Sequence, residues 1–172
     1  MLHTSIKSNN YANKGAVLGV AKYALGEHNL CNLSGATGLP YGPLPDMVAA
    51  MHDEKREFGK TNGRQVLHLV VSLDTEDSKL LTPQMLLELG YLFAREMTGC
   101  QTIFGVHNDT EHLHLHYAIN SVNYATGNKN SFSYQEVFCY YNRVFNEILY
   151  NYKKAKFGID PHHCSSIELL EQ

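Results

Sequence analysis

The pattern of apolar and polar positions predicts three strands and four helices along the chain of 172 residues. Residues 66–73, VLHLVVSL, are β-branched and nearly continuous in apolar character, which is typical of a buried central strand. Two further strands are predicted at 101–107 and 112–122, and the short link NDTE between them predicts an antiparallel hairpin. Helices are predicted at 15–26, 46–58, 83–98 and 134–157.

Residues at the ends of these segments support the predicted boundaries. Thr82 is a favourable N-cap and Pro83 a favourable first residue for the third helix. Ser133, followed three residues later by Glu136, has the capping-box pattern and begins the fourth helix. Residues 34–45, SGATGLPYGPLP, are rich in Gly and Pro and are predicted to form a loop.

The order of the elements is helix, helix, strand, helix, hairpin and helix. This order predicts an α+β fold, a central antiparallel sheet with helices packed on it, and not a parallel βαβ fold. A chain of 172 residues suits one domain with a sizeable core, so we expect a single domain over residues 1–172.

Composition narrows the function classes. The net charge of −3 argues against a large non-specific nucleic-acid binder, although Lys and Arg do cluster locally. No run of about 18 apolar residues is present, and the N-terminus lacks an apolar signal core, so we expect neither membrane insertion nor secretion. Four Cys are scattered without a CxxC pair, which indicates reduced thiols and a cytoplasmic protein.

The stretch HNDTEHLHLHYAIN, residues 107–120, holds four of the 10 histidines of the chain. Side chains alternate between the two faces of a strand. Therefore His112, His114 and His116 are predicted to share one face with Asn120, and the intervening apolar side chains to enter the core. With a four-residue link, His107 is expected opposite His112 and diagonal to His114, so the imidazoles can converge on one metal ion.

Several chemistries fit this cluster. A polar surface face is the simplest, but repeated imidazoles repel one another once they are protonated, and a metal relieves that repulsion. A structural zinc site would normally recruit Cys, and none is near in sequence. Asp109 with two His resembles the ligand set of non-haem iron oxygenases. A three-His site can also act as a Lewis acid on a phosphoryl or carbonyl oxygen, and spacing alone does not choose between these.

The longer segment VHNDTEHLHLHYAINSVNYATGNK resembles the third motif of conjugative relaxases, in the MobP-like branch of the mobilisation nucleases. That motif runs His-x-Asp-Thr-Asp-x-x-His-x-His, with an Asn four residues later, and Glu replaces its second Asp here. GRQVLHLVVSL resembles the family strand that carries a His and a Ser, here His68 and Ser72, and LTPQMLLELGYLFAREM resembles the helix after it. GVAKYAL resembles the first motif, whose nucleophile corresponds to Tyr23. The third motif occupies His107, Asp109, Thr110, Glu111, His114, His116 and Asn120.

The resemblance implies an antiparallel sheet of about five strands flanked by helices, with the His-hydrophobe-His motif on a central strand. It implies that Tyr23 attacks one phosphodiester of single-stranded DNA at a transfer origin, which forms a 5′-phosphotyrosine link and leaves a free 3′-OH. A phenol needs activation or a polarised target, and a metal ion supplies the latter. Mn²⁺ or Mg²⁺ is the expected ion, and Zn²⁺, Ni²⁺ or Co²⁺ could replace it. The expected ligands are His107, His114 and His116.

Other site residues carry more than one interpretation. Asp109 and Glu111 are expected to accept hydrogen bonds from the imidazoles, and His112 either does so or contacts DNA. His68 could orient a ligand or act as a base, or it could be an ordinary core histidine. If Tyr23 is not the nucleophile, Tyr11 is the next candidate, followed by His3 and His28. Contacts to DNA are expected from Lys14, Lys22, Lys60, Arg64, His112, Asn120 and Lys129.

The resemblance also implies partners: single-stranded DNA, accessory relaxosome proteins and a coupling protein. Relaxases are usually longer, so the chain is expected to be the catalytic domain of a longer protein. A rolling-circle replication initiator or a transposase uses the same His pair, but its Tyr usually follows the motif. A non-catalytic, metal-dependent DNA-binding module remains a third alternative, and it predicts binding without a covalent adduct.

Overall fold

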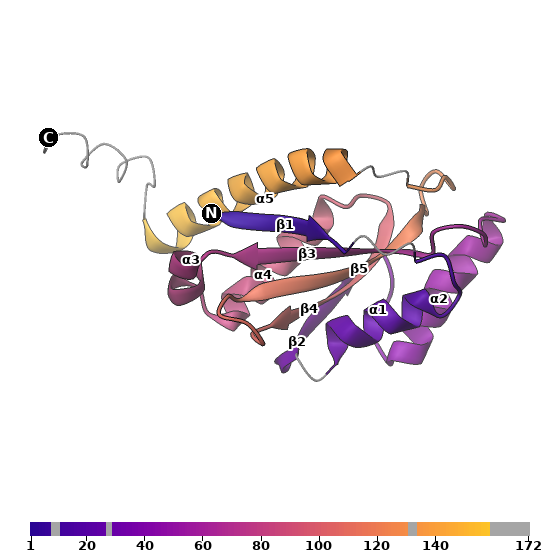
Figure 1. Cartoon of the computed structure of the whole chain (residues 1–172), viewed down its shortest axis with the longest axis horizontal. Coiled ribbons are helices and arrows are strands. Elements are labelled where there is room, and N and C mark those ends of the chain that lie inside the picture. The colour runs from indigo at the N-terminus through magenta and orange to yellow at the C-terminus, as the bar shows by residue number, and fades with distance from the viewer. Residues whose placement is uncertain (8–10, 27–28, 131–133, 159–172) are drawn as a thin grey trace, which may run out of the picture.

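The computed structural model describes residues 1–7, 11–26, 29–130 and 134–158. Five strands form one sheet in the order β1-β3-β5-β4-β2, and every neighbouring pair is antiparallel (Figure 1). The strands are β1 (Leu2–Ile6), β2 (Asn29–Thr37), β3 (Val66–Leu73), β4 (Cys100–His107) and β5 (His114–Asn123). The predicted α+β class and the placement of the histidine motif on a central strand are confirmed.

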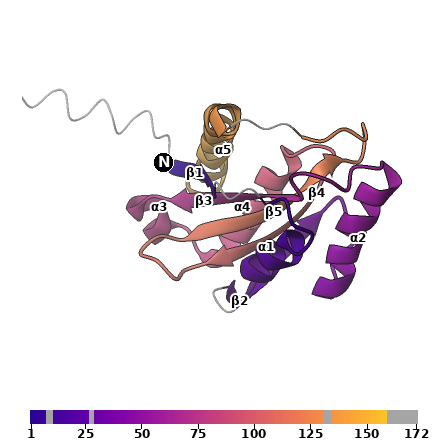
Figure 2. The same cartoon turned by 45° about the vertical axis from the view of Figure 1, so that its right-hand side comes forward.

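Helices cover both faces of the sheet (Figure 2). On one face, α1 (Ala16–Leu25) and α2 (Leu44–Glu57) bury a small apolar cluster against the sheet. On the other face, α4 (Pro83–Arg95) and α5 (Tyr134–Phe157) enclose the main core, which includes Leu115, Tyr117 and Ile119 of β5. The short α3 (Thr75–Leu80) follows β3. No helix in the described segments is long and apolar enough to span a membrane.

Some elements match the sequence predictions closely. Strand β3 has the predicted bounds, and the Thr82 hydroxyl accepts a hydrogen bond from the Met85 amide at the start of α4, at 3.2 Å. The helix α4 ends at Arg95, earlier than predicted. Ser133 lies outside the described residues, so the predicted capping box is not tested.

The prediction that residues 34–45 form a loop was wrong at its start, and strands β1 and β2 and helix α3 were not predicted. The strand β2 continues to Thr37, because Gly35 can pair with Phe104 where a larger residue could not. A Cβ at Gly35 would lie 2.6 Å from the rings of both Phe104 and Tyr91. Gly and Asn interrupt the apolar pattern of this strand, so the hydrophobic pattern did not predict it.

The β4–β5 hairpin differs from its prediction in register. His107 pairs with His114 and not with His112, and β5 begins only at His114. A shift of one residue would have turned every side chain of β5 to the opposite face, but a shift of two preserves the faces. Therefore His114 and His116 still lie opposite the core face, and the shift places His107 directly beside His114.

Candidate metal centre and nucleophile

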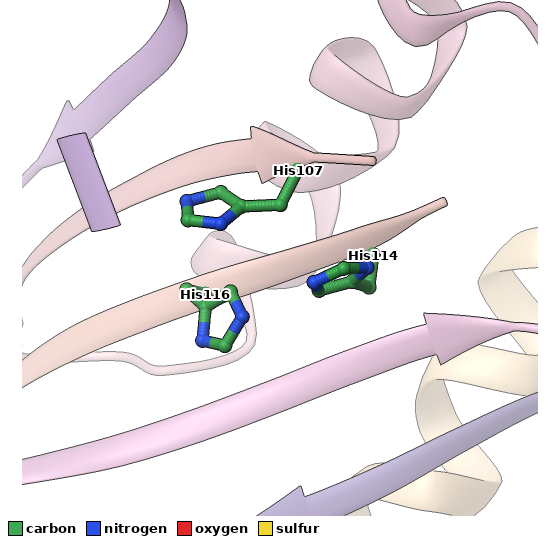
Figure 3. A group of neighbouring side chains, drawn as sticks. All are labelled: His107, His114 and His116. Carbon is green, nitrogen blue, oxygen red and sulfur yellow. The ribbon is translucent and has the colours of Figure 1, made fainter. Parts of the chain in front are cut away.

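His107, His114 and His116 form a buried cluster on the face of the sheet that α1 covers (Figure 3). One nitrogen of each ring lies within 4.8 Å of one nitrogen of each other ring. The ring centroids are 4.5 Å apart for His107 and His116, and 5.0 Å apart for His114 and His116. The predicted convergence of these three imidazoles is confirmed.

Hydrogen bonds fix which nitrogen two of these rings can offer to an ion. Nε2 of His107 lies 3.0 Å from the carbonyl oxygen of Ala24, and Nδ1 of His114 lies 2.8 Å from that of His112. A carbonyl oxygen only accepts, so both of these nitrogens carry hydrogen and donate. In the neutral rings, Nδ1 of His107 and Nε2 of His114 therefore present lone pairs.

The third ring, His116, is held by another histidine. Nδ1 of His116 lies 2.8 Å from Nε2 of His68, and Nδ1 of His68 lies 3.2 Å from the Tyr11 hydroxyl. Burial, together with the neighbouring histidines, lowers the pKa of His116 to about 2. Burial, followed by the charge of Lys7, lowers the pKa of His68 to about 4. Both rings are therefore neutral at pH 7, and each carries one N–H proton.

When His116 donates to His68 and His68 donates to Tyr11, Nε2 of His116 is left with a lone pair. Each of the three clustered histidines then has one nitrogen held by a protein group, which is the usual arrangement of metal-binding histidines. The other nitrogen of His114, Nε2, lies 3.1 Å from an oxygen of Asp109, so a bound ion would replace that contact. Two nitrogen ligands of one ion, each at about 2.1 Å, lie at most about 4.2 Å apart. The nitrogens of the cluster lie within 4.8 Å of one another, close to that limit, so the three residues could hold a divalent ion.

Two acidic residues of the third motif lie at different places. An oxygen of Asp109 is 3.1 Å from Nε2 of His114, the nitrogen that would bind an ion. Glu111 is exposed, and in the described part of the chain it makes no hydrogen bond or ion pair with a clustered histidine. The expected role for Glu111 is therefore not seen. Thr110, to which the sequence assigned no role, lies with its hydroxyl 3.4 Å from Nδ1 of His114.

Tyr23 lies on α1 directly above the histidines. Its ring centroid is 4.8 Å from that of His116, 5.6 Å from that of His107 and 5.8 Å from that of His68, while 42% of the residue remains exposed. The next residue, Ala24, supplies the carbonyl that holds His107. One turn of helix thus positions both the tyrosine and the ring of His107.

The predicted DNA-contacting residues separate into two groups. Asn120 is 1% exposed and donates to the Met51 carbonyl at 3.1 Å, so it fastens α2 to the sheet and cannot reach DNA in this structure. The ammonium group of Lys129 donates to the backbone carbonyls of Asn62 and Arg64, which positions that turn. His112 contacts the cluster through its backbone carbonyl. The remaining predicted residues are exposed: Lys14, Lys22, Lys60 and Arg64.

Comparison with known proteins identifies the family. The family model described as relaxase, MobA/VirD2-like, nuclease domain, matches residues 23–153. The chain belongs to this relaxase family. No curated protein sequence matches the chain.

A solved structure shares the relaxase fold of this chain. It comes from work on the molecular basis of vancomycin resistance transfer in Staphylococcus aureus. The match covers 92% of this chain and 96% of that chain, with a TM-score of 0.59 and 16% sequence identity. The family assignment supports DNA nicking as the activity and argues against an iron oxygenase, a rolling-circle initiator or a transposase.

Proposed function

We propose that this relaxase nicks one strand of single-stranded DNA at a transfer origin, with Tyr23 as the nucleophile. The observation that carries the proposal is the placement of an exposed tyrosine ring 4.8 Å from a buried histidine of a three-histidine cluster. An open three-histidine site and an adjacent nucleophile are what phosphoryl transfer to a side chain needs.

In the proposed step, the phenolic oxygen of Tyr23 forms a bond to the scissile phosphorus, and the bond from phosphorus to the 3′ oxygen breaks. The phenolic proton passes to solvent, which reaches the 42% exposed residue, and the departing 3′ oxygen takes a proton from solvent. The products are a 5′-phosphotyrosine link and a free 3′-OH. Attack of that hydroxyl on the link rejoins the strand.

His107, His114 and His116 would hold the divalent ion, which when bound polarises the scissile phosphate. Asp109 adds a negative charge beside Nε2 of His114, which favours a cation there. His68 acts through His116: both of its nitrogens are engaged, one with His116 and one with the Tyr11 hydroxyl. We therefore assign His68 and Tyr11 as positioning residues and not as the general base.

The test is a nicking assay with labelled single-stranded oligonucleotides that tile the DNA around the gene, run on a denaturing gel with Mn²⁺ or Mg²⁺. The proposal predicts a cleaved strand with a covalent protein–DNA band in the wild type. Both are expected to disappear in Tyr23→Phe and after chelation, while Tyr11→Phe keeps the band. Oligonucleotide binding without any adduct would instead indicate a non-catalytic DNA-binding module.

The wider setting of the reaction is also part of the proposal. A relaxase that acts on a transfer origin would work in the cytoplasm, together with accessory relaxosome proteins and a coupling protein. Co-purification of such proteins with the tagged chain from cells that carry the origin would test this setting.

A further inference from the structure

A second site lies beside α2, apart from the histidine cluster. It is a pocket of about 290 Å³ whose lining comes from α2, from the segment that precedes α1 and from the segment that leads into β3. None of the lining residues is acidic, and none belongs to the histidine cluster. They are Lys14, His52, Lys55, Arg56, Thr61 and Gln65, and we call this site the Lys55 pocket.

Lys55 is the unusual member of the pocket. It lies on the inward side of α2, is only 1% exposed, and its ammonium group has no hydrogen-bond partner within the described residues. Burial, followed by the nearby charge of Lys129, lowers the pKa of Lys55 to about 8. A buried cation without a partner is costly, and buried charges are normally paired. An anion bound in the pocket would offset this cost.

The other cations converge on the same place. Burial lowers the pKa of His52, and the charges of Lys55, Arg56 and Lys14 lower it further, so all three lie close enough to act on its ring. Arg56 also forms an ion pair with Asp53 on the exposed side of α2. A pocket with several cationic groups and no acid in its lining favours a phosphate.

The location of the pocket suggests which phosphate it would bind. The backbone N–H of Gln65 donates to the Tyr11 carbonyl at 2.7 Å, and the Tyr11 hydroxyl contacts His68 at 3.2 Å, so the pocket adjoins the residues that hold the histidine cluster. Val70 pairs with His116 on β5. From Gln65 to Val70 the chain advances roughly 16 Å, at about 3.3 Å per strand residue. The two sites are far enough apart to hold different phosphates of one strand.

We propose that the Lys55 pocket binds a backbone phosphate of the single-stranded DNA, remote from the phosphate that Tyr23 attacks. The inference rests on the proposed function, because it takes its ligand from that reaction. It assigns part of the DNA affinity to a pocket in which Lys55 is buried, in addition to the exposed lysines. The remote contact would hold the strand in register across the histidine cluster.

The experiment measures binding of the whole chain to a fluorescein-labelled oligothymidylate of about 30 nucleotides, longer than common single-strand sites of about 4–16 nucleotides. Anisotropy titrations run from about 50 to 200 mM salt, without divalent ions. Lys55→Met is compared with Lys14→Met in the same pocket, and with Lys79→Met as the matched control. Lys79 is exposed on α3, at the opposite end of the sheet from α2 (Figure 1).

The expected result is binding about tenfold weaker at low salt for Lys55→Met, since one charged hydrogen-bond partner of a phosphate is lost. The slope of log affinity against log salt should become shallower by about 0.7, the value for one single-strand phosphate contact. Lys14→Met should change both quantities in the same direction, and Lys79→Met should change neither. Lys14 is exposed, so this second variant tests the pocket even if Lys55→Met fails to fold.

Three results would overturn the proposal. Wild-type affinity and slope in both pocket variants, with the wild type still forming its Tyr23 adduct, would reject the pocket and keep the proposed function. Binding of inorganic phosphate that depends on Lys55, with an unchanged DNA slope, would assign the pocket to a small phosphate ligand. A wild-type chain that neither binds the oligothymidylate nor forms an adduct on any tiled oligonucleotide would reject both proposals.

Discussion

Replacing the buried Lys55 with methionine should stabilise the protein, and the gain should depend on pH. Burial lowers the pKa of Lys55 from its ordinary 10.5 to about 8. Between these two values the unfolded chain binds more protons than the folded one, so the contribution of Lys55 to stability rises with pH. Below about pH 8 the folded protein carries the full cost of the buried charge, and above about pH 10.5 it carries none.

The size of the effect follows from the difference of about 2.5 between these two pKa values. At 1.36 kcal/mol for each pH unit, the buried charge costs about 3 kcal/mol at pH 7 and about 1.5 kcal/mol at pH 9.5. Methionine has a similar length and carries no charge, so Lys55→Met should recover most of this cost near neutral pH. Removing the charge would thus raise stability while it weakens DNA binding.

Urea unfolding of the wild type and Lys55→Met at pH 7 and at pH 9.5, in phosphate-free buffer, measures this gain. The exposed control Lys79→Met should stay within about 0.5 kcal/mol of the wild type at both pH values. If Lys55→Met is no more stable than the wild type at pH 7, or if its gain in stability is as large at pH 9.5 as at pH 7, the buried charge carries no such cost. Either result would mean that the ammonium group is already compensated in the folded protein.

Three further predictions concern the histidine cluster. Saturating Mn²⁺, at about 100 times its Kd, should stabilise the wild type by about 2.7 kcal/mol and raise Tm by roughly 5–10 °C. His116→Ala should lose this Mn²⁺-induced rise in Tm. A rise in Tm as large as that of the wild type would mean that the ion binds elsewhere. His68→Gln should weaken Mn²⁺ binding by about 10–100-fold in calorimetric titrations, because it changes the partner of a ligand; equal affinity would make His68 an ordinary core residue. Asp109→Asn should weaken Mn²⁺ binding, since a negative charge 3.1 Å from Nε2 of His114 is lost, whereas the exposed Glu111→Gln should not. The reverse order would contradict the assignment of these two carboxylates.

The sequence predicted best those elements whose side chains repeat regularly. Strand β3 is apolar at every position except His68 and Ser72, and its bounds agreed with the structure. Strand β2 mixes Asn, Ser and Gly, and its place in the sheet depends on contacts with Phe104 and Tyr91, which are distant in sequence. The hydrophobic pattern carries no information on such contacts, so this strand was missed.

At the site, alternation along β5 was enough to place His114 and His116 on one face, but it could not fix the hairpin register. The backbone carbonyls that set the tautomers of His107 and His114 belong to Ala24 and His112. Every residue has a backbone carbonyl, so the residue types of a motif do not show which carbonyl will accept a hydrogen bond. The same holds for the bond between His68 and His116, because strand pairing alone brings those two rings together.

Mass spectrometry of the adduct tests whether Tyr23 becomes covalently linked to DNA. After nuclease and trypsin treatment, cleavage after Lys22 and Lys55 gives a peptide that begins with Tyr23, whereas Tyr11 falls in the separate peptide of residues 8–14. If Tyr23 is the nucleophile, fragmentation of the 23–55 peptide will locate a nucleotide 5′-phosphate on its first residue. A nucleotide on Tyr11, or on Tyr41 within the same 23–55 peptide, would contradict this assignment and move the nucleophile away from α1.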